Sequence, residues 1–265
     1  LSSVRFRQIA VAALSSMVFL FFFLPLLVLI PISFTSGDLL AWPPIHFSLR
    51  WYRAILHDPV LLSSTWRSIR VAFATGVLTT IIGAFAAIGL NKLPRRINAV
   101  LMTIFILPLV VPHVATGVAL YRFLSPIGLI GTDTGLILGH ILIAMPYCIT
   151  TMVSAFRSYD QRFEMAAATL GAPTLSRLIR ITIPLLRPGL TAAFLFAFSI
   201  SFDELTLALF ITGGLKTTLP KQMWDSAVLS VEPSLAAIST LLLILNTAIV
   251  LAVTFIAPRG EKTTR

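Results

Sequence analysis

Six apolar runs, each long enough to cross a lipid bilayer, dominate this chain of 265 residues. Hydrophobic residues make up 57% of the sequence and charged residues 11%, whereas a soluble domain carries about 25% charged residues. A spanning helix needs about 20 apolar residues, so the chain has room for roughly six helices and their loops. We expect an all-α integral membrane protein that forms a single domain over residues 1–265. The expected spans cover residues 9–32, 69–90, 99–121, 135–156, 189–212 and 235–257.

Lysine and arginine are distributed unevenly between the loops, and cytoplasmic loops of membrane proteins carry the excess of these residues. With the N-terminus inside, 13 of the 20 basic residues and 3 of the 10 acidic residues fall on the inside, while the outside carries equal numbers of both. The whole net charge of +10 therefore lies on one side, which predicts six spans with both termini in the cytoplasm. The inside basic residues are Arg5, Arg7, Lys92, Arg95, Arg96, Arg157, Arg162, Arg177, Arg180, Arg187, Arg259, Lys262 and Arg265.

The first apolar run follows Arg5 and Arg7, an arrangement that also begins secretory signal peptides. The run is much longer than the roughly 7–15 apolar residues of a signal peptide, and no A-x-A cleavage pattern follows it. We therefore expect a retained first helix.

Several function classes are excluded by the residues that carry chemistry. Cys148 is the single cysteine, so an intrachain disulfide and a cysteine-based metal site are excluded, and the four histidines are too dispersed for a metal site. The G-x-x-x-x-G-K-[ST] spacing of an ATP-binding loop is absent, and no cluster typical of a membrane enzyme stands out. The one-sided charge indicates a lipid surface rather than nucleic acid. We expect neither an enzyme nor a bound cofactor in this chain.

The longest segment expected in the cytoplasm, residues 157–188, has the pattern helix, glycine turn, helix. The stretch Glu164–Leu170 favours a helix, and Gly171 ends it at a position suited to left-handed dihedrals. Pro184 and Pro188 are expected to break the chain before the fifth span. The apolar side of a short helix in the cytoplasm needs a partner groove, although such a helix can also rest on lipid headgroups.

Two adjacent carboxylates, Asp203 and Glu204, interrupt the fifth run about 21 Å from its inner end at 1.5 Å per residue. A charge at this depth costs on the order of 2.5–3.5 kcal/mol unless it faces water, a cavity or a partner. Adjacent helical positions point about 100° apart. We expect one carboxylate to line a translocation pathway and the other to pair at a helix interface; alternatively, both are structural. The fifth run contains no basic residue, which disfavours an anionic cargo.

Two more polar residues complete the candidate pathway. Ser199 lies one turn before the acidic pair, and His113 lies in the third run, directly after the second of the two prolines, Pro108 and Pro112, that interrupt it. Backbone carbonyls freed at such breaks can line a cavity. His113 is therefore a candidate for the cavity wall, with a satisfied interface histidine as the alternative.

The cytoplasmic loop resembles the EAA loop of permease subunits in bacterial binding-protein-dependent ABC importers. The motif of that family reads E-A-A, three residues, Gly, nine residues and I-x-L-P. Met165 replaces the motif glutamate here, Glu164 directly precedes it, and Ile183 replaces the leucine. The resemblance extends from residues 47–52 to the sixth span. The loop residues at motif positions are Met165, Ala166, Ala167, Gly171, Ile181, Ile183 and Pro184.

The resemblance implies a type I ABC importer permease fold in the bacterial inner membrane, with multiple spans. It implies that one such chain forms half of a pathway, beside a second permease subunit that is identical or, as is usual in polyamine systems, a paralogue. An extracytoplasmic binding protein would deliver the solute, and ATP and Mg would bind to a separate ATPase dimer. The residues implied to dock the ATPase are Glu164, Met165, Ala166, Ala167, Leu170, Gly171, Ile181, Ile183 and Pro184.

Residues 201–214 and 218–224 resemble the spermidine/putrescine branch of these permeases. A cationic cargo such as a polyamine suits a carboxylate in the outer part of the fifth span. The alternatives are ABC import of another small solute (an amino acid or opine, iron, or phosphonate) and an ion-coupled secondary transporter. An ion-coupled secondary transporter predicts polar relays in several spans and inverted repeats, whereas this chain has one acidic pair and no evident repeat.

Overall fold

The computed structural model describes residues 2–44, 46–158, 160, 162–213, 217–229 and 232–256. The basic residues Arg259, Lys262 and Arg265, which entered the orientation argument, lie outside these ranges. The chain divides into two compact units, Leu1–Leu62 with Met223–Leu245 and Ser63–Gln222 with Asn246–Arg265. Each unit is considered by itself.

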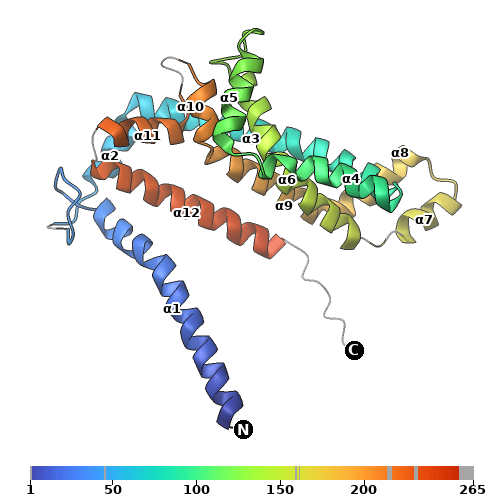
Figure 1. Ribbon diagram of the computed structural model, residues 1–265, viewed down its shortest axis with the longest axis horizontal. Coiled ribbons are helices and arrows are strands. Elements are labelled where there is room, and N and C mark those ends of the chain that lie inside the picture. The colour runs from blue at the N-terminus through green and yellow to red at the C-terminus, as the bar shows by residue number, and fades with distance from the viewer. Residues whose placement is uncertain are drawn as a thin grey trace. The chain divides into compact units, whose positions relative to one another are not determined.

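All regular elements of the described residues are helices, as the apolar runs predict (Figure 1). An isolated antiparallel bridge joins Thr35 to Phe47. The helices are α1 (Ser2–Ser33), α2 (Arg50–His57), α3 (Pro59–Asn91), α4 (Arg95–Ile106), η1 (Leu107–Leu109), α5 (His113–Leu124), α6 (Asp133–Ser158), α7 (Arg162–Thr169), α8 (Thr174–Arg177), η2 (Leu178–Thr182), α9 (Ile183–Phe202), α10 (Thr206–Ile211), α11 (Leu219–Leu229) and α12 (Pro233–Ile256).

Five stretches of helix in the described part of the chain are long and apolar enough to cross a membrane. A sixth span results if Arg95–Leu109 and His113–Leu124 count as one, although their axes differ by 96°. The break between them lies at Val110–Pro112, as expected from the two prolines of the third run. The five spans are Phe6–Ser33, Pro59–Asn91, Asp133–Ser158, Thr174–Phe202 and Pro233–Leu251.

The helix around the fifth expected span, residues 189–212, differs from expectation at both ends. Pro184 and Pro188 do not break the chain, because helical turns run from Thr174 to Phe202 through α8, η2 and α9. The turn before Pro184 is a π-helix, and Pro184 lies in the first turn of α9. A proline is tolerated where a helix begins a new hydrogen-bond register, because its missing N–H removes no interior bond there.

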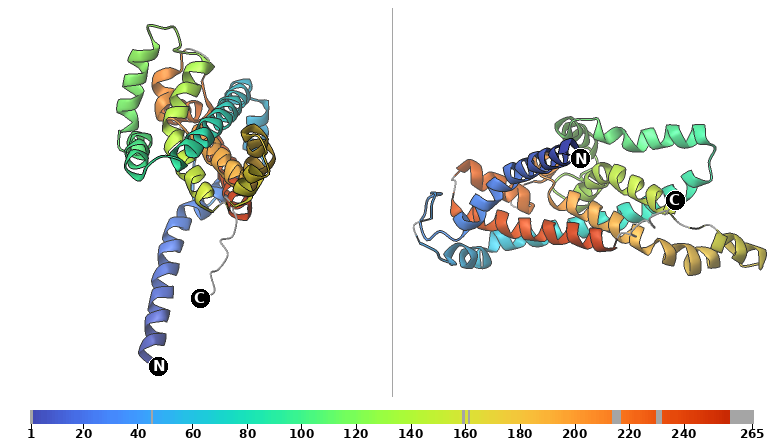
Figure 2. Two further views of the ribbon diagram at one scale, coloured as in Figure 1. Left: turned by 90° about the vertical axis from the view of Figure 1, so that its right-hand side faces the viewer. Right: turned by 90° about the horizontal axis from the view of Figure 1, so that it is seen from below.

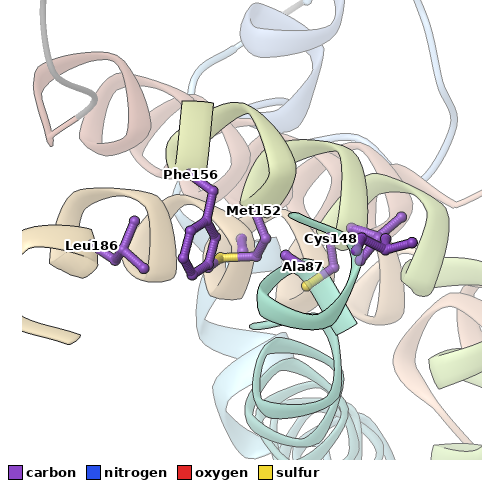
Figure 3. Packing of buried hydrophobic residues seen from close by; sticks show 8 residues of the cluster. Ala87, Cys148, Met152, Phe156 and Leu186 are labelled. Atoms are coloured by element: carbon purple, nitrogen blue, oxygen red, sulfur yellow. The ribbon is translucent and has the colours of Figure 1, made fainter. Parts of the chain in front are cut away.

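A core of apolar side chains joins three helices of the second unit. Cys148, Met152 and Phe156 follow one another at intervals of four residues on α6, so they lie on one face of the helix. Figure 3 shows this row between Ala87 of α3 and Leu186 of α9. Cys148 is a free, fully buried thiol and serves as a small apolar side chain, as expected.

Glycines allow α3 and α6 to approach each other closely. A Cβ atom at Gly83 would lie 2.6 Å from the Sγ atom of Cys148, nearer than real Cβ atoms come to their neighbours. A Cβ atom at Gly89, two turns further along α3, would meet nothing within 4 Å. The absence of a side chain at Gly83 is therefore a requirement of packing.

Gly83→Ala should destabilise the purified protein by about 1–3 kcal/mol, because the added methyl group displaces Cys148. Gly89→Ala is the matched control and should be neutral or stabilising by about 0.5–1 kcal/mol, because alanine favours the helix. Thermal unfolding in detergent measures both changes. Equal midpoints for the two variants would contradict the close approach of α3 and α6.

Candidate functional site

The hairpin of α7 and α8 lies at one end of the second unit (Figures 1 and 2). Gly171 has φ +80°, as the glycine turn predicts. Its N–H donates to the carbonyl of Ala168, and the N–H of Ala172 donates to that of Ala167, both at 3.0 Å. These two bonds form a Schellman cap, which satisfies the last carbonyls of α7 and reverses the chain toward α8.

The predicted docking residues of the hairpin do not all face the same way. Leu170, at the turn, is 88% exposed, and Met165 and Ala166 on α7 are also exposed. Glu164 instead accepts a hydrogen bond from the hydroxyl of Thr182, with 3.3 Å between Oγ1 and Oε2. Thr182 is buried in the π-helical turn, so the carboxylate that precedes the motif connects the two arms of the hairpin.

The last part of the motif lies further along the second arm. Ile181, Ile183 and Pro184 are partly buried or only moderately exposed, at the junction of η2 and α9. Counting from Thr174 at 1.5 Å per residue, they lie about 10–15 Å along the helix from the start of α8. The structure therefore separates an exposed tip around Leu170 from a semi-buried base at Pro184.

The sequence pattern predicted that Asp203 and Glu204 lie within one continuous helix, and this prediction is wrong. The helix α9 ends at Phe202, and α10 begins at Thr206. The pair therefore lies in a break between two helices, where backbone groups lose their intrahelical partners.

Asp203 is exposed and belongs to a polar chain that reaches α12. Its two carboxylate oxygens accept hydrogen bonds from Nδ2 of Asn246 at 3.0 and 3.3 Å. The carbonyl of the same amide accepts a hydrogen bond from the hydroxyl of Ser199 at 3.2 Å. The structure thus brings together Ser199 and Asp203 through a residue that the sequence analysis missed. The signal available in the sequence was Asn246, a polar amide side chain inside the sixth apolar run.

Glu204 is buried and has different partners. One carboxylate oxygen accepts the backbone N–H of Leu207 at 2.9 Å, which caps α10. The other lies 3.6 Å from Nδ1 of His113, the first residue of α5. The breaks in the third and fifth expected spans therefore meet at this pair, which becomes an ion pair when His113 is protonated.

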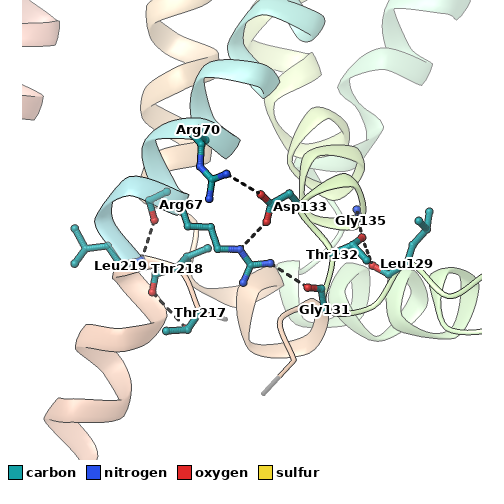
Figure 4. A network of polar contacts seen from close by, with 11 residues as sticks. Arg67, Arg70, Leu129, Gly131, Thr132, Asp133, Gly135, Thr217, Thr218 and Leu219 are labelled. Atoms are coloured by element: carbon teal, nitrogen blue, oxygen red, sulfur yellow. Dashed lines mark hydrogen bonds and ion pairs between the residues drawn. The ribbon is translucent and has the colours of Figure 1, made fainter. Parts of the chain in front are cut away.

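A second polar cluster, which sequence reasoning did not find, surrounds Arg67 (Figure 4). Arg67 is buried and donates from Nε to Asp133 at 2.7 Å and from a terminal nitrogen to the carbonyl of Gly131 at 3.2 Å. Arg70, one turn later on α3, approaches the other oxygen of Asp133 at 4.0 Å. Nearby, the hydroxyl of Ser68 accepts the N–H of Leu219 at 2.8 Å. The cluster joins α3 to the start of α6 and the start of α11, beside a cavity of about 440 Å³.

An all-helical chain with several apolar spans and with carboxylates at a helix break is constructed like a membrane transport subunit. Residues 79–262 match the family of binding-protein-dependent transport system inner membrane components, and the chain belongs to this family. It is a multi-pass inner-membrane protein and the permease subunit of an ABC importer, which confirms the family that the loop resembles.

Known relatives cover most of the chain. The putrescine transport system permease protein PotI of Escherichia coli (strain K12) is 33% identical over 85% of this chain and 82% of its own length. The spermidine/putrescine permease PotC of Haemophilus influenzae is 26% identical over 88% and 90%. The molybdenum transport system permease ModB of Mycobacterium bovis is 29% identical over 84% and 91%.

Solved structures agree with the fold. A bacterial ABC transporter involved in the import of alginate superposes with a TM-score of 0.74 at 21% identity, covering 96% of this chain and 97% of the other. A second crystal structure, of the alginate transporter with its substrate-bound periplasmic protein, gives a TM-score of 0.67 at 13% identity. At such low identity, the likeness establishes the architecture alone.

Arg67→Gln should destabilise the protein by about 1.5–3 kcal/mol, because the charge-assisted bonds of a buried guanidinium to Asp133 and Gly131 are lost. Arg70→Gln removes the same charge from a side chain that is 55% exposed and should cost less than about 1 kcal/mol. Thermal unfolding of the two variants in detergent measures the difference. A larger loss for Arg70→Gln would contradict the central place of Arg67.

Proposed function

We propose that this permease subunit forms half of the translocation pathway of an importer for a small cationic solute such as a polyamine. The observation that carries the proposal is the exposed carboxylate of Asp203 at the break between α9 and α10. An exposed carboxylate inside a membrane segment attracts a cation and repels an anion. The putrescine and spermidine/putrescine permeases among the relatives support this cargo class, whereas a molybdenum permease of similar identity keeps other solutes as the alternative.

The proposed pathway uses the two carboxylates differently. Asp203, Ser199 and Asn246 form a polar wall that a cation with N–H donors can contact. Glu204 and His113 hold the two helix breaks together, so that the freed backbone groups have fixed partners. This division of roles follows from exposure, because Asp203 is exposed and Glu204 is buried.

The proposed topology has six spans in one domain and places both termini in the cytoplasm. The bent pair α4 and α5 counts as the third span. The excess of basic residues on one side of the chain supports this orientation, which places the hairpin of α7 and α8 in the cytoplasm.

An ATPase dimer is proposed to dock on that hairpin, and ATP and Mg are proposed to bind on the ATPase, since this chain lacks an ATP-binding loop motif. The helix from Thr174 to Phe202 leads directly from the hairpin to Asp203, a rise of about 42 Å. A continuous helix transmits displacement of one end to the other. Movement of the hairpin would therefore reach the break that holds the acidic pair.

The remaining proposed partners are a second permease subunit and an extracytoplasmic binding protein. The helix α1 exposes its apolar side chains along its length, from Phe6 to Leu27. Such a surface suits lipid or the apolar helices of a second permease subunit. Homodimeric and heterodimeric pairing both satisfy this requirement.

The rival function, an ion-coupled secondary transporter, makes a different prediction about energy. Transport in proteoliposomes should require ATP, the ATPase subunit and the binding protein, and it should persist when ion gradients are collapsed. Uptake driven by an ion gradient without ATP would favour the rival.

Asp203→Asn should lower the rate of polyamine uptake by on the order of 10–100-fold, because one charge-assisted contact is worth about 1.5–3 kcal/mol. Assembly of the complex should be unchanged. Glu204→Gln should act mainly on stability, because its partners are the α10 backbone and His113. Asp38→Asn, in an exposed pair with Arg50, is the control. Normal uptake by Asp203→Asn would refute the pathway role of this carboxylate.

Leu170→Asp should weaken binding of the ATPase by at least about tenfold, since an exposed leucine at the hairpin tip suits an apolar pocket of the partner. Leu229→Asp makes the same change at a side chain that is 86% exposed, compared with 88% for Leu170. Titration of the purified permease with the ATPase measures both affinities. Equal affinities of the two variants for the ATPase would show that the hairpin tip is not part of the docking surface.

A further inference from the structure

A cavity of about 370 Å³ lies between the hairpin and the neighbouring ends of α3 and α6. Its apolar wall includes Phe85 and Ile88 of α3, Phe156 of α6 and Leu178 of η2. All of these residues belong to the second unit. The cavity shares Glu164 and Met165 with the predicted docking residues, but its lining includes neither Leu170 at the hairpin tip nor the residues of the acidic break.

The cavity lies where two of the candidate membrane spans end. Two spans, Pro59–Asn91 and Asp133–Ser158, end at its edge. Phe85 lies seven residues before Lys92, a rise of about 10 Å along α3. With the ends of these two spans at the bilayer boundary, the apolar wall would be at the depth of upper acyl chains and the open edge at the depth of headgroups.

Two cations line this open edge. Lys92 follows the last residue of α3, and Arg177 is the last residue of α8. Arg177 donates from one terminal nitrogen to the hydroxyl of Thr174 at 3.3 Å, but its buried Nε atom has no acceptor among the described residues. A buried N–H without an acceptor carries a desolvation penalty, which an anionic oxygen in the cavity would remove.

One carboxylate, Glu164, also lines the cavity, and it accepts a hydrogen bond from the hydroxyl of Thr182. Two cations and one carboxylate leave the cavity with a net positive charge. An apolar interior with a cationic edge matches a molecule with an apolar body and an anionic head.

We propose that this cavity binds an anionic phospholipid, with its headgroup phosphate at Lys92 and Arg177 and its upper acyl chain against Phe85 and Phe156. The leaflet depends on the proposed orientation of the chain, which makes it the cytoplasmic one. Basic pockets beside the ends of membrane helices bind anionic headgroups for the same electrostatic reason. The lipid would occupy the space between the hairpin and the spans, and it would stiffen their connection.

Native mass spectrometry of the assembled importer, after exchange with phosphatidylglycerol or phosphatidylcholine, tests the proposal without any variant. Phosphatidylglycerol should be retained about 25-fold more than phosphatidylcholine, since each of the two cations raises the affinity for an anionic lipid about fivefold. Equal retention of the two lipids would overturn the proposal. Lipid retention requires no transport, so this outcome is independent of whether the cargo or the ATPase docking is assigned correctly.

Variants then locate the site. Lys92→Gln with Arg177→Gln should lower phosphatidylglycerol retention by about 25-fold. Arg95→Gln with Arg96→Gln removes the same charge from the adjacent exposed residues, which do not line the cavity, and should lower it less than about twofold. Equal effects of the two pairs would mean non-specific attraction by surface charge and would overturn the site.

A photoreactive benzophenone amino acid in place of Phe85, which is 62% exposed, distinguishes the two possible occupants. Irradiation of the assembled importer should yield adducts with phospholipid. Adducts with the ATPase subunit instead would show that a protein side chain fills the cavity and would refute the lipid assignment.

Discussion

The uninterrupted helix from Thr174 to Phe202 is the connection on which the rest of this structure depends. It begins in the hairpin of α7 and α8 and ends at the acidic break, so one continuous element joins the two sites of the proposed mechanism. The π-helical turn at Leu178–Thr182 preserves this continuity, because it brings the chain into a new hydrogen-bond register just before Pro184. Had Pro184 broken the helix, the hairpin could have moved without displacing the break.

A membrane interior without water explains the form of that break. Backbone groups at the ends of α9 and at the start of α10 need partners from within the protein. Glu204 supplies one by accepting the N–H of Leu207, and it is held by His113 from a second broken helix. Asp203 accepts hydrogen bonds from the neutral amide of Asn246. The two adjacent carboxylates thereby differ in burial and in partner: Asp203 is exposed and Glu204 is buried.

Features set by local chemistry could be predicted from sequence, and those set by distant contacts could not. The apolar runs predicted the helices, Gly171 predicted a left-handed turn, and the third run was expected to break at its prolines. The continuity at Pro184 was missed, since a proline alone does not reveal the register of the preceding turn. The bond between Arg67 and Asp133 joins residues 66 positions apart, and no pattern along the chain encodes such a pairing.

Close packing determines how movement of the hairpin would spread. Gly189 of α9 lies against Ala155 of α6, where an added Cβ atom would overlap the alanine side chain. The core of Cys148, Met152 and Phe156 continues this contact and includes Ala87 of α3. Interfaces of this density slide poorly, because any relative shift forces small residues against larger ones. Displacement of the hairpin should therefore carry α9, α6 and the part of α3 around Ala87 as one body. The conformational change would then be concentrated where helices are already interrupted, at Val110–Pro112 and at Asp203–Leu205.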